Sequence, residues 1–298
     1  MNPAAERNGK WAATAAIVLA FLAADFFTPG WFDGSDGPRE YGLAFMLGVC
    51  IAQVNLTATW AALAPGNVAL RLPWSLLLTV LMWYGLVLGN QCHGHPMRLE
   101  EALTLGAVLL GGVVIAQCPL WIAGRVFHWR LVAWNGTADA LEPRRLQFHL
   151  GHLFVGTLLL SIALALGRIV LPPGKPTLNL DHELPVLLGA VVVCNLLITV
   201  PCIWGAFLKR GRLLLVAVGW LLYCAGVTVA EYLALMAFLG PPGPQENEVA
   251  IYFLLMNVVQ CATVLVTLRI FRSLGMRLVR TNKPASPFAP GAIVNQDP

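Results

Sequence analysis

The sequence predicts an all-α protein, a polytopic bundle of eight transmembrane helices that forms a single domain over residues 1–280. Hydrophobic residues make up 58% of the 298-residue chain and charged residues only 11%, whereas a soluble domain carries about 25% charged residues. The apolar residues form long runs, and the basic residues gather in alternate connections between them. Because so few charges do not cover a water-facing surface, the expected solvent is lipid.

Eight segments reach the roughly 20 mainly apolar residues that a helix needs to cross a bilayer. They cover residues 11–28, 41–64, 72–90, 101–124, 149–171, 184–207, 213–239 and 249–271. Transmembrane strands are excluded because the runs are too long and lack alternation. Stretches rich in Pro and Gly, such as GPPGP after the seventh segment, separate several of the helices. The tail at residues 281–298 is rich in Pro, Ala and Asn, which predicts disorder.

The basic residues predict the orientation. If the N-terminus is cytoplasmic, 15 of the 19 Lys and Arg residues lie on the cytoplasmic side. The four on the outer side are Arg39, Arg98, Arg168 and Lys175. Because translocation of positive charge is disfavoured, both termini are predicted to be cytoplasmic, in a multi-pass protein of the bacterial inner (plasma) membrane.

Residues 1–27 also fit a secretory signal peptide, since a basic start precedes a short apolar run. The stretch Leu22-Ala23-Ala24 is a poor cleavage site, and Asp25-Phe26-Phe27 continues the apolar segment. An uncleaved first helix is therefore the favoured interpretation, with cleavage as the alternative.

The lipid bilayer is the partner that the composition implies. The net charge of +4 does not indicate nucleic acid, because the basic residues are spread along the chain and face one side of the membrane. Six of the seven cysteines lie in apolar runs, where they are expected as small buried hydrophobes, and only Cys92 lies in a connection. The cysteines therefore predict no disulfide framework. Nothing in the sequence specifies a protein partner.

The chain shows a possible internal duplication at a shift of 144 residues. The aligned pairs are Pro29-Gly30 with Pro173-Gly174, Cys50 with Cys194, Trp60 with Trp204, and Arg125-x-Phe127 with Arg269-x-Phe271. Repeats over residues 11–130 and 149–275 would each hold four helices and would therefore be parallel. Apolar sequences match one another easily, so a chance alignment is the alternative.

The connection NQCHGHPM places Cys92, His93, His95 and Met97 close together. Thiolate, thioether and imidazole groups suit Cu(I), and imidazole also suits Zn²⁺, with His182 of a later outer loop as a further candidate ligand. The alternative is a polar turn made by Gly and Pro. The turn is favoured because the spacing matches no closed zinc pattern, and no cofactor is expected.

Three other histidines suggest haem or metal. His149 and His152 share a face at the start of the fifth predicted helix, and His128 lies across the preceding connection. Paired axial ligands usually come from facing helices deeper in the membrane, so anchoring at the interface is the favoured role. No G-x-S-x-G, P-loop or HExxH motif stands in a suitable context. No catalytic residue is therefore assigned, and the sequence argues against an enzyme.

Glu231 is the most informative single residue, because it lies about eight residues inside the seventh predicted helix, roughly 12 Å deep. An ionisable group at that depth is costly and faces a partner or a cavity. Asn257 and Arg168 are the candidate partners, and Asp25, closer to the interface, is a weaker candidate site. Glu231 is either a proton- or cation-linked carboxylate or part of a structural pair that locks helices together. The structural pair is favoured because one carboxylate makes no relay.

The stretch RRLQFHLGHLFVGTLLLSIALALGR, residues 144–168, resembles a segment of uncharacterised polytopic membrane proteins of planctomycete bacteria. The likeness is carried by a basic pair and the start of a Leu-rich helix, at Arg144, Arg145, Gln147, Phe148, Leu150 and Leu153. His149 and Gly151 depart from it. The resemblance implies a multi-pass membrane protein and no activity, since none is assigned to that family.

Three classes of function remain. A structural or assembly-type membrane module without catalysis is favoured, because the sequence lacks a catalytic constellation. A small-solute or ion carrier using Glu231 is the alternative, and a metal- or haem-linked membrane enzyme is the third. A packed interior around Glu231 would favour the first, a water-filled cavity the second, and facing pairs of histidines the third.

Overall fold

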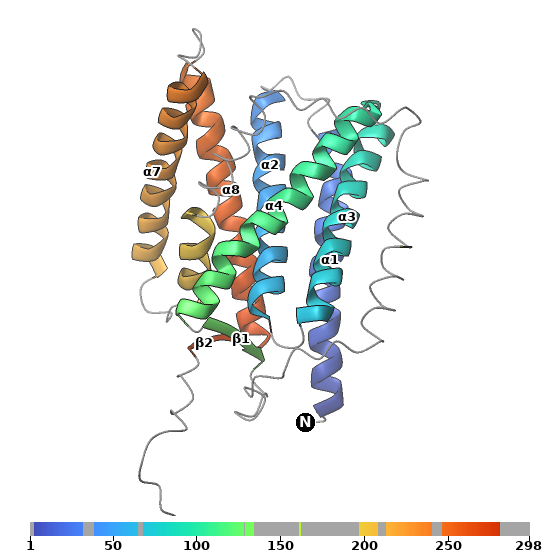
Figure 1. The fold of residues 1–298 in the computed structure, drawn as a ribbon, viewed down its shortest axis with the longest axis vertical. Coiled ribbons are helices and arrows are strands. Elements are labelled where there is room, and N and C mark those ends of the chain that lie inside the picture. Colours follow the sequence, from blue (N-terminus) through green and yellow to red (C-terminus); the bar gives the residue numbers. More distant parts are fainter. Residues whose placement is uncertain are drawn as a thin grey trace, which may run out of the picture.

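The computed structural model describes residues 3–31, 39–64, 68–127, 129–133, 161, 197–207, 213–239 and 246–280. Its long helices are α1 (Pro3–Trp31), α2 (Arg39–Leu63), α3 (Val68–Cys92), α4 (Leu99–Val126), α7 (Leu213–Leu239) and α8 (Glu246–Ser273). A shorter helix covers Leu197–Ala206. The described part of the chain also contains two strands, β1 (Trp129–Ala133) and β2 (Met276–Arg280). Figure 1 shows the helices side by side in a bundle, with both strands at the end where α1 begins.

Within the described residues, five helical stretches are long and apolar enough to cross a membrane, which supports the predicted transmembrane helix bundle. They are Ala12–Gly30, Tyr41–Leu63, Leu70–Cys92, Leu99–Val126 and Val249–Ser273. These are the first four and the last of the predicted segments. Helix α7 covers the seventh, and Leu197–Ala206 lies within the sixth. The predicted fifth helix, apart from Ser161, and the predicted disordered tail lie outside the described residues.

The core of the bundle forms around α2, which packs most extensively against α8 and α4. Small and branched side chains fill this contact, and the largest cluster is built from Ala52, Ala58, Ala116, Leu120, Ile198, Cys202, Ile203, Ala206, Cys224, Val227, Cys261, Val264 and Leu268. Large apolar side chains such as Leu19, Ile122 and Leu222 are exposed on the outside. Lipid is the solvent in which such an exposed apolar surface is stable.

Helix α1 lies against α3 because two glycines of α3 allow a close approach. Gly85 and Gly89 are one turn apart, and a Cβ at Gly89 would collide with the main-chain carbonyl of Phe26. At Gly85 a Cβ would lie 3.3 Å from the Cβ of Asp25. This Gly-x-x-x-Gly spacing permits the backbone contact on which helix association in lipid depends.

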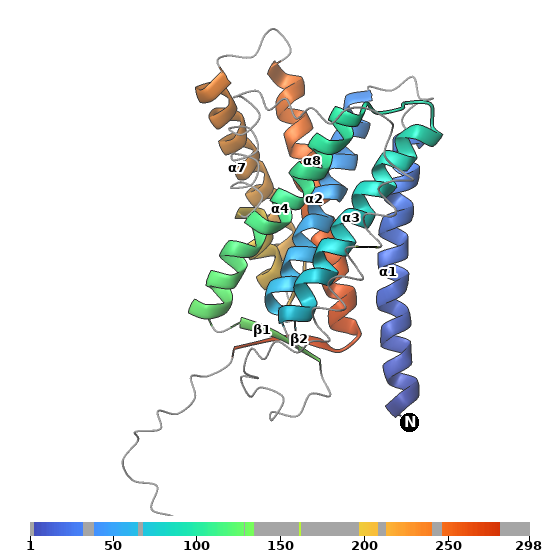
Figure 2. The ribbon, with the colours of Figure 1, turned by 45° about the vertical axis from the view of Figure 1, so that its right-hand side comes forward.

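An antiparallel ribbon that the sequence did not predict joins the ends of α4 and α8. Strand β1 pairs with β2, and Leu131 lies opposite Leu278 at the centre of the register. Each strand begins after a connection of two residues that follows its helix. Figure 2 shows the ribbon passing across the end of the bundle. Both strands are only five residues long, which is too short for a periodic hydrophobic pattern to indicate them.

Candidate functional site

Glu231 forms a hydrogen-bonded pair with α8. Its side chain is only 7% exposed. The Nδ2 of Asn257 donates to Glu231 Oε2 at 2.5 Å and to Thr228 Oγ1 at 3.1 Å. Asn257 itself is buried. One carboxamide therefore holds two polar groups of α7 against α8.

Helical spacing explains why Glu231 points inward. Thr228 lies three residues before Glu231 and shares its face, while Val229 and Leu233 are exposed on the other side of α7. Cys224, one turn further along the buried face, donates weakly through Sγ to the Asn257 carbonyl at 3.9 Å. A buried carboxylate without hydrogen bonds would be costly, and the amide of Asn257 offsets part of that cost.

Asp25 forms a second carboxylate–carboxamide pair, between α1 and α2. It is 2% exposed, and its Oδ1 accepts a hydrogen bond of 2.6 Å from Nε2 of Gln53. Its Oδ2 is buried and has no hydrogen-bond partner. The sequence places Asp25 close to the interface, but the close approach of α1 to α3 buries its side chain.

Further polar side chains are buried along the inner helices. Those of α2, α4 and α8 include Asn55, Thr59, Gln117, Gln260 and Thr267. Asn55 and Gln260 are almost completely buried, and both make polar interactions. Such groups hold transmembrane helices together, because lipid offers them no competing partner. The arrangement is suited to fixing helix positions. Among the described residues, Asp25 Oδ2 and Thr59 Oγ1 are buried oxygens without a hydrogen-bond partner.

The connection NQCHGHPM forms the turn between α3 and α4. The His95 N–H donates to the Asn90 carbonyl, and Gly94 takes a positive φ of 85°. His93 Nδ1 donates to the Gly89 carbonyl at 2.7 Å, so that ring nitrogen is engaged within the helix end. Within the described part of the chain, no group of three or more His, Cys, Asp or Glu residues could hold a metal ion. Cys92 is exposed.

Several predicted candidates lie outside the described residues. They are Arg168, His182, His128, His149 and His152. The structure therefore brings Glu231 together with Asn257 but leaves Arg168 untested as a partner.

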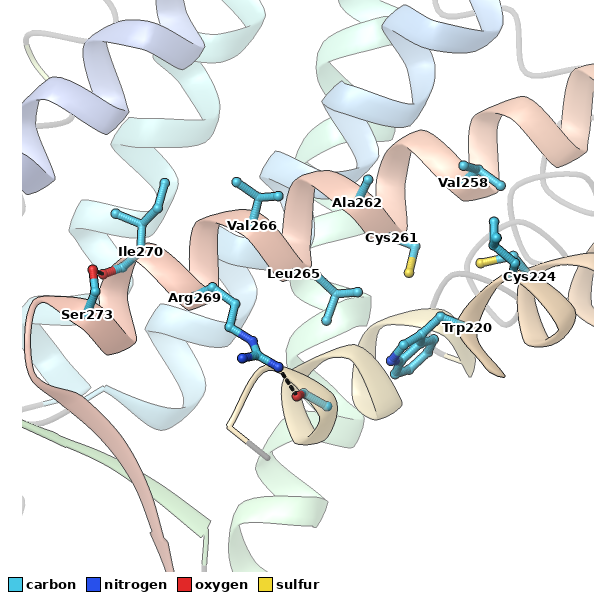
Figure 3. A pocket seen from close by; sticks show the side chains of 12 residues that line it. Trp220, Cys224, Val258, Cys261, Ala262, Leu265, Val266, Arg269, Ile270 and Ser273 are labelled. Carbon is cyan, nitrogen blue, oxygen red and sulfur yellow. Dashed lines mark hydrogen bonds between the residues drawn. The ribbon is translucent and has the colours of Figure 1, made fainter. Parts of the chain in front are cut away.

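A pocket of about 610 Å³ lies between Leu197–Ala206, α7 and α8. Figure 3 shows Trp220, Cys224, Cys261 and Leu265 along its wall, with the Arg269 guanidinium at one end donating to the Gly205 carbonyl at 3.5 Å. Its wall is almost entirely apolar, and Glu231 is not part of it.

Beside this pocket, the Sγ atoms of Cys202 and Cys261 lie 3.3 Å apart. Both thiols are buried and free. The two residues belong to separate apolar runs, so only tertiary packing reveals the pair. Gln53, by contrast, could have been identified from the sequence, because it is a polar residue in the middle of an apolar segment.

Comparison with protein-family models finds no match, and comparisons with curated proteins and with solved structures find none either. The functional argument therefore depends on the geometry of the buried polar groups. That geometry consists of two carboxylates, each held by a carboxamide of a neighbouring helix.

Proposed function

We propose that the protein is a structural or assembly-type membrane module without catalysis of its own. The hydrogen bond between Asn257 and Glu231 carries this proposal. A carboxylate that serves transport needs access to a cavity, whereas Glu231 is engaged by α8 and lies off the wall of the apolar pocket. Its hydrogen bond to Asn257 is what a group that fixes α7 against α8 would make.

For the topology, we propose eight transmembrane helices in the bacterial inner membrane, with both termini in the cytoplasm. The distribution of arginines supports this orientation. Several arginines lie at or near the ribbon end of the bundle, at the start of α3, at the ends of α4 and α8, and in the strands. They include Arg71, Arg125, Arg130, Arg269 and Arg277. Arg98 lies at the opposite end, in the connection from α3 to α4. An end so rich in arginine is expected on the cytoplasmic side.

For the internal organisation, we propose two parallel repeats, residues 11–130 and 149–275, with one strand of the ribbon at the C-terminal end of each repeat. Arg130-Leu131-Val132 in β1 and Arg277-Leu278-Val279 in β2 are identical tripeptides. They pair antiparallel about Leu131 and Leu278, which gives the ribbon a local two-fold relation. Each strand follows the fourth helix of its repeat after two residues. The offset between the strands is 147 residues, the same as between α4 and α8 and three more than the 144-residue shift that aligns the two halves of the sequence.

An ion or small-solute carrier is the second candidate, and Asp25 favours it. Its Oδ2 is a buried acceptor without a partner, which is the kind of group that binds a proton or a cation inside a membrane. Under this alternative Asp25 is the binding carboxylate and Glu231 a structural one.

Two measurements on the purified protein test the proposal. Extraction of the native membrane in mild detergent should yield the 32.2 kDa chain within a larger assembly. Glu231→Gln should keep that assembly because the amide can still accept from Asn257, and Glu231→Leu should weaken it. Proteoliposomes with an internal pH dye should show no proton flux above protein-free vesicles under an imposed potential.

A flux that is lost in Asp25→Asn and retained in Glu100→Gln, a change at an exposed residue of α4, would replace the module with the carrier. A chain that migrates alone and shows no flux would contradict both functions.

A further inference from the structure

Arg71 is a buried cation in the first turns of α3, near the ribbon end of the bundle. Its side chain is 8% exposed. Nη1 donates to the carbonyl of Ala64, just beyond the end of α2, while the buried Nε has no hydrogen-bond partner. A guanidinium carries five N–H donors in a fixed plane, so one carbonyl satisfies a small part of what Arg71 offers.

A second arginine belongs to the same end of the bundle. Arg130 lies in β1, and β1 packs against the end of α2, where Arg71 binds the Ala64 carbonyl. No carboxylate among the described residues pairs with Arg71. Arg130 is exposed, so its side chain can turn toward a ligand that also reaches Arg71.

Burial of a charge without a counter-charge is costly, and a neighbouring like charge increases the cost. An anion placed between the two guanidinium groups would remove both penalties. Planar guanidinium groups match oxyanions that accept two hydrogen bonds at once, and phosphate is the commonest of these.

Capping of α2 is the simpler role for Arg71, since a cation at a helix C-terminus is favourable. Arg272 shows what such a cap looks like here: it donates to the Ala206 carbonyl at 3.2 Å, at the end of Leu197–Ala206, and is only half-buried. A cap accounts for Nη1 of Arg71. It does not account for the buried Nε, which has no hydrogen-bond partner.

We propose that Arg71 and Arg130 bind a phosphate-type oxyanion at the ribbon end of the bundle. Two sources offer this chemistry, the headgroup of an anionic phospholipid and a soluble phosphate. Arg71 is the second residue of the apolar stretch Leu70–Cys92, a depth at which lipid phosphates lie. Anionic lipids attract basic residues at the membrane surface. The site stands on its own geometry and does not depend on the proposed module function.

The test uses the full chain in nanodiscs, with thermal unfolding and native mass spectrometry as readouts. One arm compares phosphatidylcholine alone with phosphatidylcholine mixed with phosphatidylglycerol. The other titrates inorganic phosphate into phosphatidylcholine nanodiscs at constant ionic strength. The variants are Arg71→Gln and Arg130→Gln, and Arg125→Gln, at an exposed arginine of the last turn of α4, is the matched control.

We expect the wild type and Arg125→Gln to be stabilised and to retain the anion, and Arg130→Gln to bind it roughly tenfold more weakly. Arg71→Gln should lose the response, and should it fail to fold, Arg130→Gln decides. A response to phosphatidylglycerol alone identifies a lipid headgroup, and a response to phosphate in phosphatidylcholine identifies a soluble oxyanion. No response in the wild type, or equal responses in Arg130→Gln and Arg125→Gln, would overturn the site.

Discussion

Asn257 of α8 donates from one Nδ2 atom both to the Glu231 carboxylate, at 2.5 Å, and to the Thr228 hydroxyl of α7, at 3.1 Å. This contact joins two helices, and the burial of all three side chains keeps water from competing for the hydrogen bonds. The nearest comparison within the chain is Asp25, which Gln53 holds in the same way, but whose second oxygen, Oδ2, is buried without a hydrogen-bond partner. The two pairs therefore differ in how completely the carboxylate is satisfied, and their variants should behave differently.

Glu231→Gln should leave the free energy of unfolding within about 0.5 kcal/mol of the wild type, since an amide oxygen still accepts from Asn257. Glu231→Leu should cost about 1–3 kcal/mol, because it removes an acceptor from a buried amide. Unfolding in mixed micelles of increasing denaturing detergent measures both. Leu233→Ala, on the exposed face of α7, is the control and should have little effect. Equal stability of the Leu variant and the wild type would show that the pair does not hold the helices.

Asn257→Leu should be more damaging than Glu231→Leu, because it leaves a carboxylate buried without its donor. In the double variant, a coupling energy of about 0.5–3 kcal/mol is expected for residues in direct contact. The same micelle titration of the wild type, the two single variants and the double variant completes this double-mutant cycle. Additive effects would contradict the hydrogen bond on which the proposed function depends.

Asp25→Asn should be neutral or stabilising, in contrast to substitutions that break a hydrogen bond. The Asn oxygen can still accept from Gln53 and the buried charge is removed, while an amide Nδ2 takes the place of the unpartnered Oδ2. Gln53→Leu should destabilise by about 1–3 kcal/mol, since it leaves the carboxylate without its donor. Thermal unfolding of the two variants beside the wild type gives the comparison. A large loss of stability in Asp25→Asn would mean that the charge itself is required, as a carrier would need.

Gly89→Leu should disrupt the contact between α1 and α3, because even a Cβ would strike the carbonyl of Phe26. We expect a loss of at least ~1–3 kcal/mol, the cost of overpacking a filled interface. Gly111→Leu in α4 is the matched control, since a Cβ there meets no atom within 4 Å. Thermal unfolding in detergent compares the two. Similar values for the two variants would place α1 away from α3.

The helices were predictable from the sequence because their signal is local. Apolar runs of the length of a bilayer define α2, α4 and α8 within a few residues. Glu231 was also identifiable, since a charge in such a run stands out against its neighbours and must face inward. A nearby amide on another helix was a reasonable partner to expect, and Asn257 lies in contact with it.

The ribbon and the cysteine pair could not be predicted in this way. Leu131 and Leu278 are 147 residues apart in the chain, and five-residue strands are too short to show a period. The contact between Cys202 and Cys261 depends on how two helices rotate about their axes. Arg71 was expected to be an ordinary cytoplasmic charge, because its burial depends on tertiary packing at the end of α2, where Nη1 donates to the Ala64 carbonyl.

Cys92 tests the proposed orientation, because it is exposed in the turn between α3 and α4. An impermeant maleimide added to intact spheroplasts should label it from outside. A reporter fused after Pro298 should be active in the cytoplasm, since both termini are proposed to lie inside. Cys92→Ser is the control and should abolish the labelling. Labelling that requires lysis of the cells would reverse the orientation.

Cys202 and Cys261 provide a direct test of how Leu197–Ala206 packs against α8. Their Sγ atoms are 3.3 Å apart and both are free thiols, so a small rotation brings them within bonding distance. A membrane-permeant oxidant such as iodine should join them. Mass spectrometry of the digested protein should then find the peptides of the two residues cross-linked. Cys261→Ser should abolish that link, whereas Cys118→Ser, at a cysteine exposed on α4, should leave it intact. A link that forms instead between other cysteines would show that this helix packs elsewhere in the bundle.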